Sequence, residues 1–580
     1  MSPTQGSTPG PAVRGARRFT SVRRLAAAGL GAALLAGGLA GCFGGGDDKD
    51  TKKATATADQ GLPGADLHPA SDAKVRDGGT LRVGVTSFPA TFNPVHADGV
   101  GSTAPQILAP TTGSAIQVDD RGDWSVDQDY ARSVEITDRD PLTVRVELNP
   151  RAVWQGGSPI TSNDMVAYVA AMQDDDFAAA GPPVLADVDE VRPDGRFAYD
   201  VVFDEPNTDW PDAVYPALPA AVTKSPTVFN RTLVSRPPSS NGPFRIASIA
   251  RETGTITLER NPRWWGATPR LGRIVFRVAD APVLADAYTA GELEAVPVTP
   301  DNRDRLLGAK EQFRTASGSD WAQLTLNGGS PVLSDARVRQ AIWAAVDADG
   351  IVESTGRRYG TRAARMDTVV LLPNQVGHQA PAGTGRDLAR ARQLLAKAGW
   401  TRTGDATTVT KDGRPLTLRL PVPDTMTGAV QRAEEIRDDL AEVGVTVVVT
   451  QVPGATFFDQ VVIPLDFDLT TFTWSGAAFP VTGTRRLFTP IDSPLNFTGK
   501  ASKAITAAFD AAIATLDPAD RTARIAAVEK VATAQASIMP LVVIPRVMAV
   551  EPAVRNFGPT SLAAVDWTRV GFAATTTDQD

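Results

Sequence analysis

Residues that bind metals or form cross-links are scarce in this sequence. Its 580 residues include one cysteine, Cys42, and three widely spaced histidines, His68, His96 and His378. A single thiol excludes a disulfide framework and multi-cysteine metal sites, and the absence of an H-E-x-x-H spacing disfavours a zinc hydrolase. The sequence therefore predicts no disulfide, no metal site and no iron–sulfur cluster.

The sequence also lacks the motifs of nucleotide and ester chemistry. It has no G-x-x-x-x-G-K-[ST] loop, so we expect no ATP hydrolysis by this chain itself, and no G-x-S-x-G nucleophile elbow. Acidic runs such as Asp174-Asp175-Asp176 and Glu434-Glu435 diverge on a helix, whereas acid–base catalysis needs two carboxyl groups converging on one bond. We predict a protein that is not an enzyme and has no catalytic residues and no cofactor; a secreted hydrolase is the disfavoured alternative.

Basic residues are outnumbered by acidic ones beyond residue 41. From residue 42 onward, 53 basic residues stand against 66 acidic ones, a net charge of −13. Phosphate binding needs a basic surface, so we predict that nucleic acid is not a partner. Hydrophobic residues make up 42% of the chain, which is too many for a disordered protein.

One apolar run stands out near the start, at residues 25–39. Five arginines precede it, and Leu39-Ala40-Gly41-Cys42 ends it. This order resembles a bacterial lipoprotein signal, in which the cysteine sulfur receives a diacylglyceryl group and the chain is cut before it. We predict a signal peptide at residues 1–41 and lipidation of Cys42, which would anchor the protein at the extracytoplasmic face of the cell membrane through two or three acyl chains. The pair Arg23-Arg24 leaves open whether export is general or twin-arginine.

The next segment, residues 42–77, has few large apolar side chains. It is rich in Gly, Asp, Lys, Thr and Ala, and such a composition cannot bury enough surface to fold. We therefore predict a flexible tether. No later run of eighteen apolar residues follows, so we predict a protein that is anchored to the membrane and does not span it.

Beyond the tether, the pattern mixes strands and helices. Alternating apolar residues predict half-buried strands at residues 81–85, 142–148 and 274–278. Helical spacing predicts helices at residues 338–345, 388–398, 430–440 and 505–516. Asp335 is the expected N-cap of the first helix, and Gly399 the residue that ends the second. A strand directly after the third helix implies α/β units.

Several blocks follow one another in a specific order from residue 78 to the end. They are Gly78–Gly84 with Pro89–Pro94, Trp154–Asp164, Gly242–Phe244 with Glu259–Trp265, Leu326–Asn327 with Asp335–Ala341, and Ala391–Gly399. In this order and spacing they resemble the bacterial extracellular solute-binding proteins of the peptide, oligopeptide and nickel class, family 5. Part of each block also has a mechanical explanation: Thr161 and Asp164 fit a capping box, and Arg337 and Arg339 fit pairing or capping around their helix.

The resemblance implies an α/β fold of the periplasmic-binding-protein type, cluster C, with two lobes, a hinge between them and an extra domain. Lobe I would combine residues 78–105, 237–320 and 546–580, the extra domain residues 106–236, and lobe II residues 321–545. Such receptors close their lobes over a ligand. The implied function is that of a monomeric, membrane-anchored receptor that delivers peptides or peptide-like solutes to an ABC permease, whose ATPases are further chains.

The resemblance also implies which residues bind the ligand. They are Phe88, Asn93, Asn327, Gly328, Trp474, Ser475 and Ala477. In many peptide binders an Asp at the position of Ala477 pairs with the α-ammonium group of the peptide. A buried ammonium without a carboxylate is costly, so we expect either a compensating acid, Asp466 or Asp468, or a ligand whose amine is blocked. The missing acid also supports the alternative, an envelope lipoprotein that regulates cell-wall assembly on the same scaffold without transport.

Overall fold

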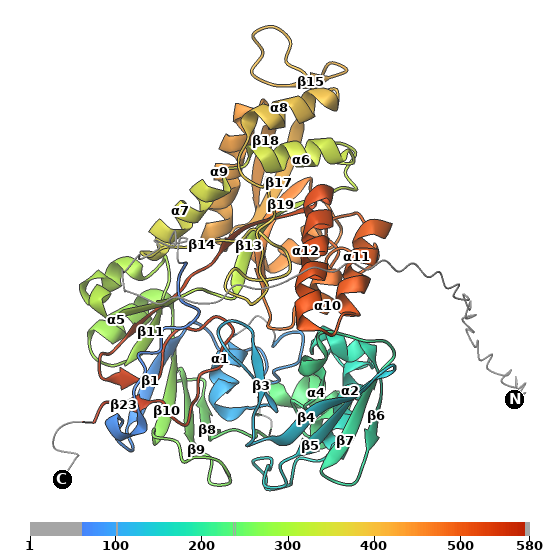
Figure 1. The fold of residues 1–580 in the computed structure, drawn as a ribbon. Helices are drawn as coiled ribbons and strands as arrows, with labels where there is room; N and C mark the ends of the chain where they lie inside the picture. The colour runs from blue at the N-terminus through green and yellow to red at the C-terminus, as the bar shows by residue number, and fades with distance from the viewer. Residues whose placement is uncertain (1–60, 100–102, 236, 238, 575–580) are drawn as a thin grey trace, which may run out of the picture. The chain divides into compact units, whose positions relative to one another are not determined.

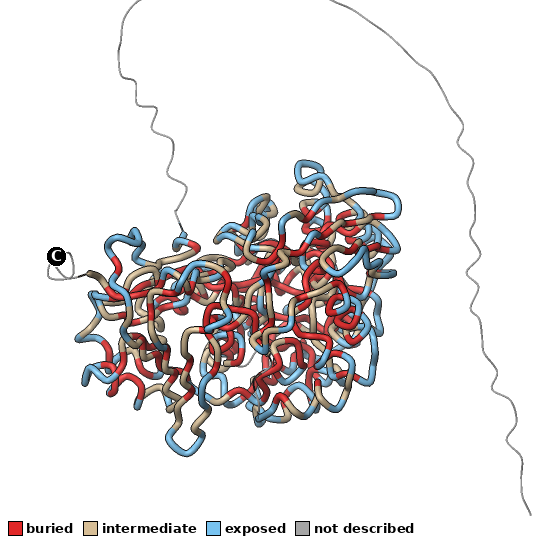
Figure 2. Tube along the Cα trace, turned by 90° about the horizontal axis from the view of Figure 1, so that it is seen from below, coloured by how far each residue is buried: buried red, intermediate tan, exposed pale blue. Residues whose placement is uncertain are grey.

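The computed structural model describes residues 61–99, 103–235, 237 and 239–574, which belong to one compact unit. The predicted signal peptide and Cys42 lie outside the described residues. Within the unit, Figure 1 shows a lobe with β13 and α6 to α12, a second lobe around β1, β8 to β11 and α5, and a third body around β4 to β7. Figure 2 shows the buried residues running through the interior of each part, with the exposed ones at the loops.

Lobe I is built on a sheet of seven strands in the order β12-β21-β11-β1-β10-β9-β8. The strands are β1 (Thr80–Val85), β8 (Phe244–Ala250), β9 (Thr255–Arg260), β10 (Arg273–Val278), β11 (Ala295–Val298), β12 (Phe313–Ala316) and β21 (Arg546–Val550). Strand β1 runs parallel to β10 and β11, and Leu81 and Val83 lie fully buried in the sheet. Helix α5 (Ala281–Thr289) and the 3₁₀ helix η6 (Arg303–Gln312) pack with β11 and β21 around Leu284 and Leu306.

The extra domain has its own antiparallel sheet of four strands, in the order β4-β5-β7-β6. Its main elements are β2 (Ile116–Val118), β3 (Trp124–Val126), β4 (Ala131–Arg139), β5 (Leu142–Leu148), α2 (Ser162–Met172), β6 (Val188–Pro193), β7 (Ala198–Phe203) and α4 (Pro226–Arg231). Thr161 and Asp164 form the predicted capping box at the start of α2. Gly242 is required where the chain returns to lobe I, because a Cβ there would lie 2.5 Å from the backbone carbon of Thr111.

Lobe II is built on a sheet in the order β14-β20-β13-β19, beside which the parallel pair β17 and β18 lies. The strands are β13 (Asp320–Leu326), β14 (Ala364–Arg365), β17 (Thr417–Pro423), β18 (Thr446–Val452), β19 (Leu469–Ser475) and β20 (Ile538–Val543). The helices are α6 (Ala336–Ala345), α7 (Ala348–Tyr359), α8 (Leu388–Lys397), α9 (Thr427–Glu442), α10 (Val481–Arg485), α11 (Lys503–Ile513) and α12 (Pro518–Gln535). Because side chains alternate along a strand, Leu324 of β13 packs with α6 to α9, and Trp321 packs with α11 and α12.

The predicted strands and helices are confirmed in the described residues. The strands are β1, β5 and β10, and the helices are α6, α8, α9 and α11. Asp335 caps α6 by accepting a hydrogen bond from the backbone N–H of Arg337, and Gly399 has a φ of +90° just past α8. No helix in the described part of the chain is long and apolar enough to cross a membrane.

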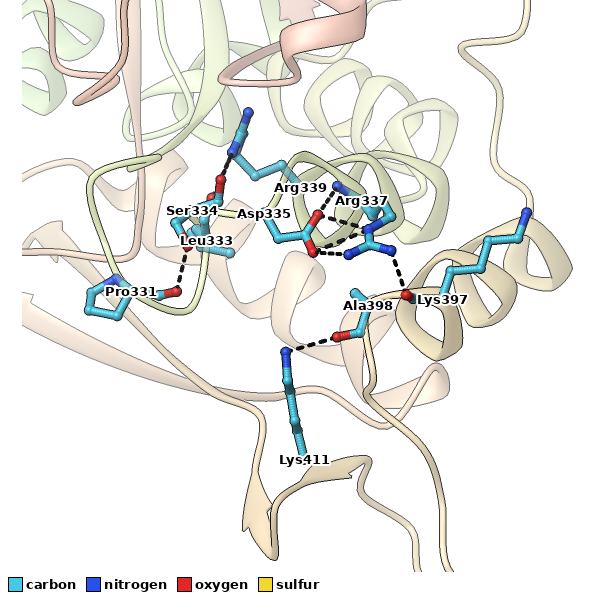
Figure 3. A network of polar contacts seen from close by, with 9 residues as sticks. All are labelled: Pro331, Leu333, Ser334, Asp335, Arg337, Arg339, Lys397, Ala398 and Lys411. Atoms are coloured by element: carbon cyan, nitrogen blue, oxygen red, sulfur yellow. Dashed lines mark hydrogen bonds and ion pairs between the residues drawn. The ribbon is translucent and has the colours of Figure 1, made fainter.

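The arginines of the most specific sequence block have the predicted structural role. Arg337 pairs with Asp335 at 2.7 Å and donates a hydrogen bond to the carbonyl of Lys397 at the end of α8. Arg339 is buried and donates to the carbonyls of Leu333 and Gln535 (Figure 3 shows the network around both arginines). The block therefore fastens α6 to its neighbours and leaves no arginine free for a ligand.

The tether prediction is wrong for residues 61–77. Val75 is buried, and this segment forms isolated bridges to Thr560 and Ala573 near the end of the chain. The backbone N–H of Ser317 also donates to the carbonyl of Pro63, at 2.7 Å. A composition argument cannot detect such packing, because extended backbone can be held by hydrogen bonds to a distant segment without many apolar side chains.

Two chain segments connect lobe I with lobe II. Ser317–Ser319 joins β12 to β13, and residues 544–545 join β20 to β21. The two crossings are bonded to each other, since the N–H of Ile544 donates to the carbonyl of Asp320 at 2.8 Å. A pair of short, hydrogen-bonded crossings is the geometry of a hinge.

Candidate functional site

The predicted site residues of lobe I lie in the loop after β1. Phe88 is half-buried, and the guanidinium carbon of Arg251 lies 5.0 Å from its ring centre. Asn93 is fully buried: its Nδ2 donates to the carbonyl of Phe229 at 3.1 Å, and its Oδ1 accepts from the N–H of Val95 at 3.1 Å. Asn93 thus ties the loop to α4 of the extra domain, and a ligand could reach it only after these bonds open.

Asn327 and Gly328 follow β13 and are held by other parts of lobe II. Nδ2 of Asn327 donates to the carbonyls of Leu465 and Phe467, and Oδ1 accepts from the N–H of Gly329. Gly328 is buried, and a Cβ there would lie 2.3 Å from the side chain of Lys500. Asn327 therefore holds the backbone of this loop in place, and Gly328 allows the close approach of Lys500.

Trp474 lies near the end of β19 in a cluster of aromatic rings. Its ring stacks on Phe497, with centres 5.8 Å apart and planes 8° apart, and meets Phe472 edge-on at 5.2 Å. The indole is half-buried, and its Nε1 is buried without a hydrogen-bond partner in the described part of the chain. Aromatic packing fixes the ring, while the unsatisfied donor could still serve an acceptor on a ligand.

Ser475 and Ala477 are exposed and lie beside the hinge. Oγ of Ser475 donates to Oδ1 of Asp320 at 2.6 Å, because Asp320 is its partner in the β13–β19 ladder. The carbonyl of Ala477 accepts from Nε2 of Gln375 at 3.1 Å. Asp320 is the acidic residue that sequence reasoning missed, since it stands 155 positions away from Ser475 and no local pattern links the two.

The acids that we predicted as replacements are engaged elsewhere. Asp466 pairs with Arg419 at 2.7 Å, and Asp468 is buried, accepting from Oγ of Ser330 and from the N–H of Arg419. Asp320 has its own cation, Arg546 of β21, at 3.7 Å across the hinge. Asp320, the acid opposite Ser475, is therefore already paired.

The structure does not bring all predicted residues into one place. Leu326, just before Asn327, pairs with Leu469, whereas Asp320 pairs with Ser475 at the other end of the same ladder. At the usual rise per residue, these ends are roughly 20 Å apart. Only the Trp474 to Ala477 end adjoins the hinge, so we take residues 474–477 with Asp320 as the candidate site. The resemblance indicated the loop after β1, the end of β13 and the end of β19 as parts of one site. It carried no information on the antiparallel register of β13 and β19, which separates the last two.

A contact between lobe II and the extra domain lies directly after the candidate site. Oδ2 of the buried Asp209 accepts from the N–H of Thr482 in α10 at 2.6 Å. Nearby, the N–H of Thr208 donates to the carbonyl of Ile513, and Arg521 donates to Oγ1 of Thr208. Burial raises the pKa of Asp209 to about 6, against the lowering effect of its hydrogen bonds to Thr482 and the charge of Arg521. The extra domain therefore fixes the chain that follows Ala477.

The described residues offer little support for metal or cavity chemistry. They contain no group of three His, Cys, Asp or Glu side chains that could hold a metal ion. A surface hollow of about 490 Å³ lies on lobe I beside Gly79 and Arg260, away from the candidate site.

Two solved structures have a fold similar to that of this chain. The fold matches the periplasmic EDTA-binding protein EppA with a TM-score of 0.78 at 23% identity, covering 90% of this chain and all of that one. It matches lactococcal OppA, in a closed complex with an endogenous peptide, with a TM-score of 0.71 at 18% identity, covering 85% of this chain and all of that one. This chain therefore has the same two-lobed fold as these proteins.

The sequence comparisons give the family. The model of the bacterial extracellular solute-binding proteins, family 5 Middle, matches residues 126–490. The oligopeptide-binding protein OppA of Mycobacterium tuberculosis is 31% identical over 522 residues, 88% of this chain and 87% of the relative. This chain belongs to the family 5 solute-binding proteins. It is also 27% identical over 367 residues to the M. tuberculosis protein named "Probable monoacyl phosphatidylinositol tetramannoside-binding protein LpqW", covering 58% of this chain and 57% of that one.

Proposed function

We propose that this protein is a membrane-anchored receptor that binds peptides or peptide-like solutes and presents them, with closed lobes, to an ABC permease. The observation that carries the proposal is the position of Trp474, Ser475 and Asp320 beside the double crossing of the hinge. A ligand held there contacts the part of lobe II that must move when the lobes close. The similarity to OppA over most of the chain supports peptides as the ligand class. No step in this function requires catalysis.

A second candidate is an envelope lipoprotein that uses the same scaffold without transport. The similarity to LpqW and the presence of Ala477, where many peptide binders carry an acid, favour it. The two candidates differ in ligand and partner. Native mass spectrometry of the purified soluble body would show which solute it carries, and co-purification would show whether a permease accompanies it.

Comparing peptides with a free and a blocked amine tests which peptides this receptor binds. Asp320 is already balanced by Arg546, so a free α-ammonium gains little charge compensation near Ala477. We expect an N-acetylated tetrapeptide to bind roughly tenfold more tightly than the same peptide with a free amine, as measured by calorimetric titration. In Asp320→Asn, the free-amine form should weaken no further. Tighter binding of the free-amine form, lost in Asp320→Asn, would instead identify Asp320 as the ammonium partner.

The anchor has a separate test. If Cys42 is lipidated, Cys42→Ser should leave a protein that is uncut or shed into the medium and carries no acyl chains. Membrane fractionation and intact mass measurement check both results, with Gly44→Ala as the matched control that should stay anchored. Unchanged membrane retention of Cys42→Ser at the normal mature mass would contradict the anchor.

A further inference from the structure

Two guanidinium groups of lobe II converge on one glycine. Arg358 in the last turn of α7 donates from Nη2 to Oγ1 of Thr427 at 3.3 Å, and its Nη1 lies 2.8 Å from the position of a Cβ on Gly428. Arg432, one turn further along α9, donates from Nη1 to the carbonyl of Gly428 at 3.2 Å. Its Nε donates to Oγ1 of Thr471 at 2.6 Å. The glycine thus leaves room for Arg358 beside Arg432.

Neither cation has a carboxylate within ion-pair distance among the residues that the structure describes. Among the ion pairs of the described residues, Arg337, Arg386 and Arg419 of the same lobe each have an acid, whereas Arg358 and Arg432 have none. The nearest acid on α9, Glu435, instead accepts a hydrogen bond from Nε2 of Gln431 on its own helix. Two like charges beside the same residue repel each other. An anion bound between them would offset this repulsion.

Arg432 is also deeply buried, with 5% of its surface exposed. Burial, together with the charge of Arg358, lowers its pKa to about 10, against the raising effect of Glu435 and Tyr359. A buried charge without a counter-ion is costly, and the start of α9 adds to the positive field, because its first turn contains no acidic residue and Met426 gives no side-chain cap. The two guanidinium groups and the start of α9 together give this site a positive potential.

The cluster lies where lobe II meets lobe I. Nη1 of Arg303 in η6 donates to the carbonyl of Arg357 at 3.2 Å. Tyr359, next to Arg358, packs against the apolar cluster of lobe I that includes Phe313. Thr471, which holds Arg432, is in β19 three residues before Trp474. The cluster and the candidate site therefore share a strand and the lobe boundary.

We propose that Arg358 and Arg432 form a subsite for an oxyanion of the bound solute, either a carboxylate or a phosphate group. Guanidinium groups bind the two oxygens of such groups with paired hydrogen bonds, and an anion here would supply the missing counter-charge. Arg358, half-buried at the end of α7 and bonded to Thr427 at the start of α9, is the accessible member, and Arg432 is the buried one. The inference rests on the proposed function for the identity of the solute, but not for the binding of an anion.

Inorganic phosphate is the probe for the subsite itself. At constant ionic strength, replacing chloride by phosphate should raise the melting temperature of the full chain, and Arg358→Gln should abolish that rise. Arg357→Gln is the matched control, because Arg357 is an exposed neighbour on the same helix whose ion pair is with Glu353. An equal rise in the melting temperature of Arg358→Gln and of the wild type would overturn the proposal. This comparison does not depend on the buried Arg432, so it holds even if Arg432→Gln does not fold.

The second arm distinguishes a carboxylate from a phosphate. The N-acetylated tetrapeptide with a free carboxylate should bind roughly tenfold more tightly than its C-terminal amide, and Arg358→Gln should remove the difference. A phosphate effect without any carboxylate preference assigns the subsite to phosphorylated solutes. If neither peptide form binds the wild type, the peptide proposal fails, and the phosphate arm alone decides the subsite.

Discussion

Replacing Gly318 with alanine is expected to destabilise the protein severely. Gly318 lies in the first hinge crossing, and a Cβ there would be 2.0 Å from the carbonyl oxygen of Ile544 in the second. The crossings cannot simply move apart, since the N–H of Ile544 donates to Asp320 and Oγ of Ser561 donates to the carbonyl of Gly318. We expect a loss of about 3 kcal/mol or more in the free energy of unfolding, measured by urea denaturation.

Gly308→Ala is the matched control for this prediction. Within the described part of the chain, no atom lies within 4 Å of a Cβ at Gly308, so the substitution should change the unfolding free energy by no more than about 0.5 kcal/mol. If Gly318→Ala and Gly308→Ala unfold at the same urea concentration, the crossings have room for a side chain. The hinge would then lack the close backbone packing described here.

Asp209→Asn is expected to remove a part of the pH dependence of stability. The pKa of Asp209 is raised by burial from its ordinary value of 3.8 to about 6, so the folded protein binds more protons than the unfolded chain between these values. Stability contributed by the protonated group is therefore lost as the pH rises from about 4 to about 6, and it stays lost above. The effect is on the order of 3 kcal/mol. Asparagine keeps an oxygen that can accept from the N–H of Thr482 but does not ionise.

The measurement is the unfolding free energy of wild type and variant at pH values from 4 to 8. Glu529, Asp439 and Asp212 also have pKa values raised by burial, to about 7, about 6 and about 7. The charge of Asp209 contributes to the shift of Asp212, so the difference between the two curves reports Asp209 together with its coupling to Asp212. Asp204→Asn, at an exposed position nearby, should leave the wild-type curve unchanged. Parallel curves for wild type and Asp209→Asn would mean that this carboxyl titrates as in the unfolded chain.

Local elements could be predicted because each depends on residues close in sequence. Asp335 caps α6 through an amide two residues away, and Gly399 takes the left-handed conformation that ends α8. The order of the family blocks likewise identified the fold class, since each block is a local turn, cap or strand end. Residues 61–77 were predicted wrongly because the same local reasoning could not see the distant backbone that holds them.

The functional geometry depended on contacts between residues far apart in the chain. Ser475 meets Asp320, Thr482 meets Asp209 at a separation of 273 positions, and Arg432 meets Arg358 through α9. The sequence by itself determined the helices, the strands and the resemblance to a binding protein, because spacing and capping are local properties. Only the tertiary structure decided which strand end adjoins the hinge, which acid is already paired and which arginines have no counter-ion, because these follow from how the lobes pack.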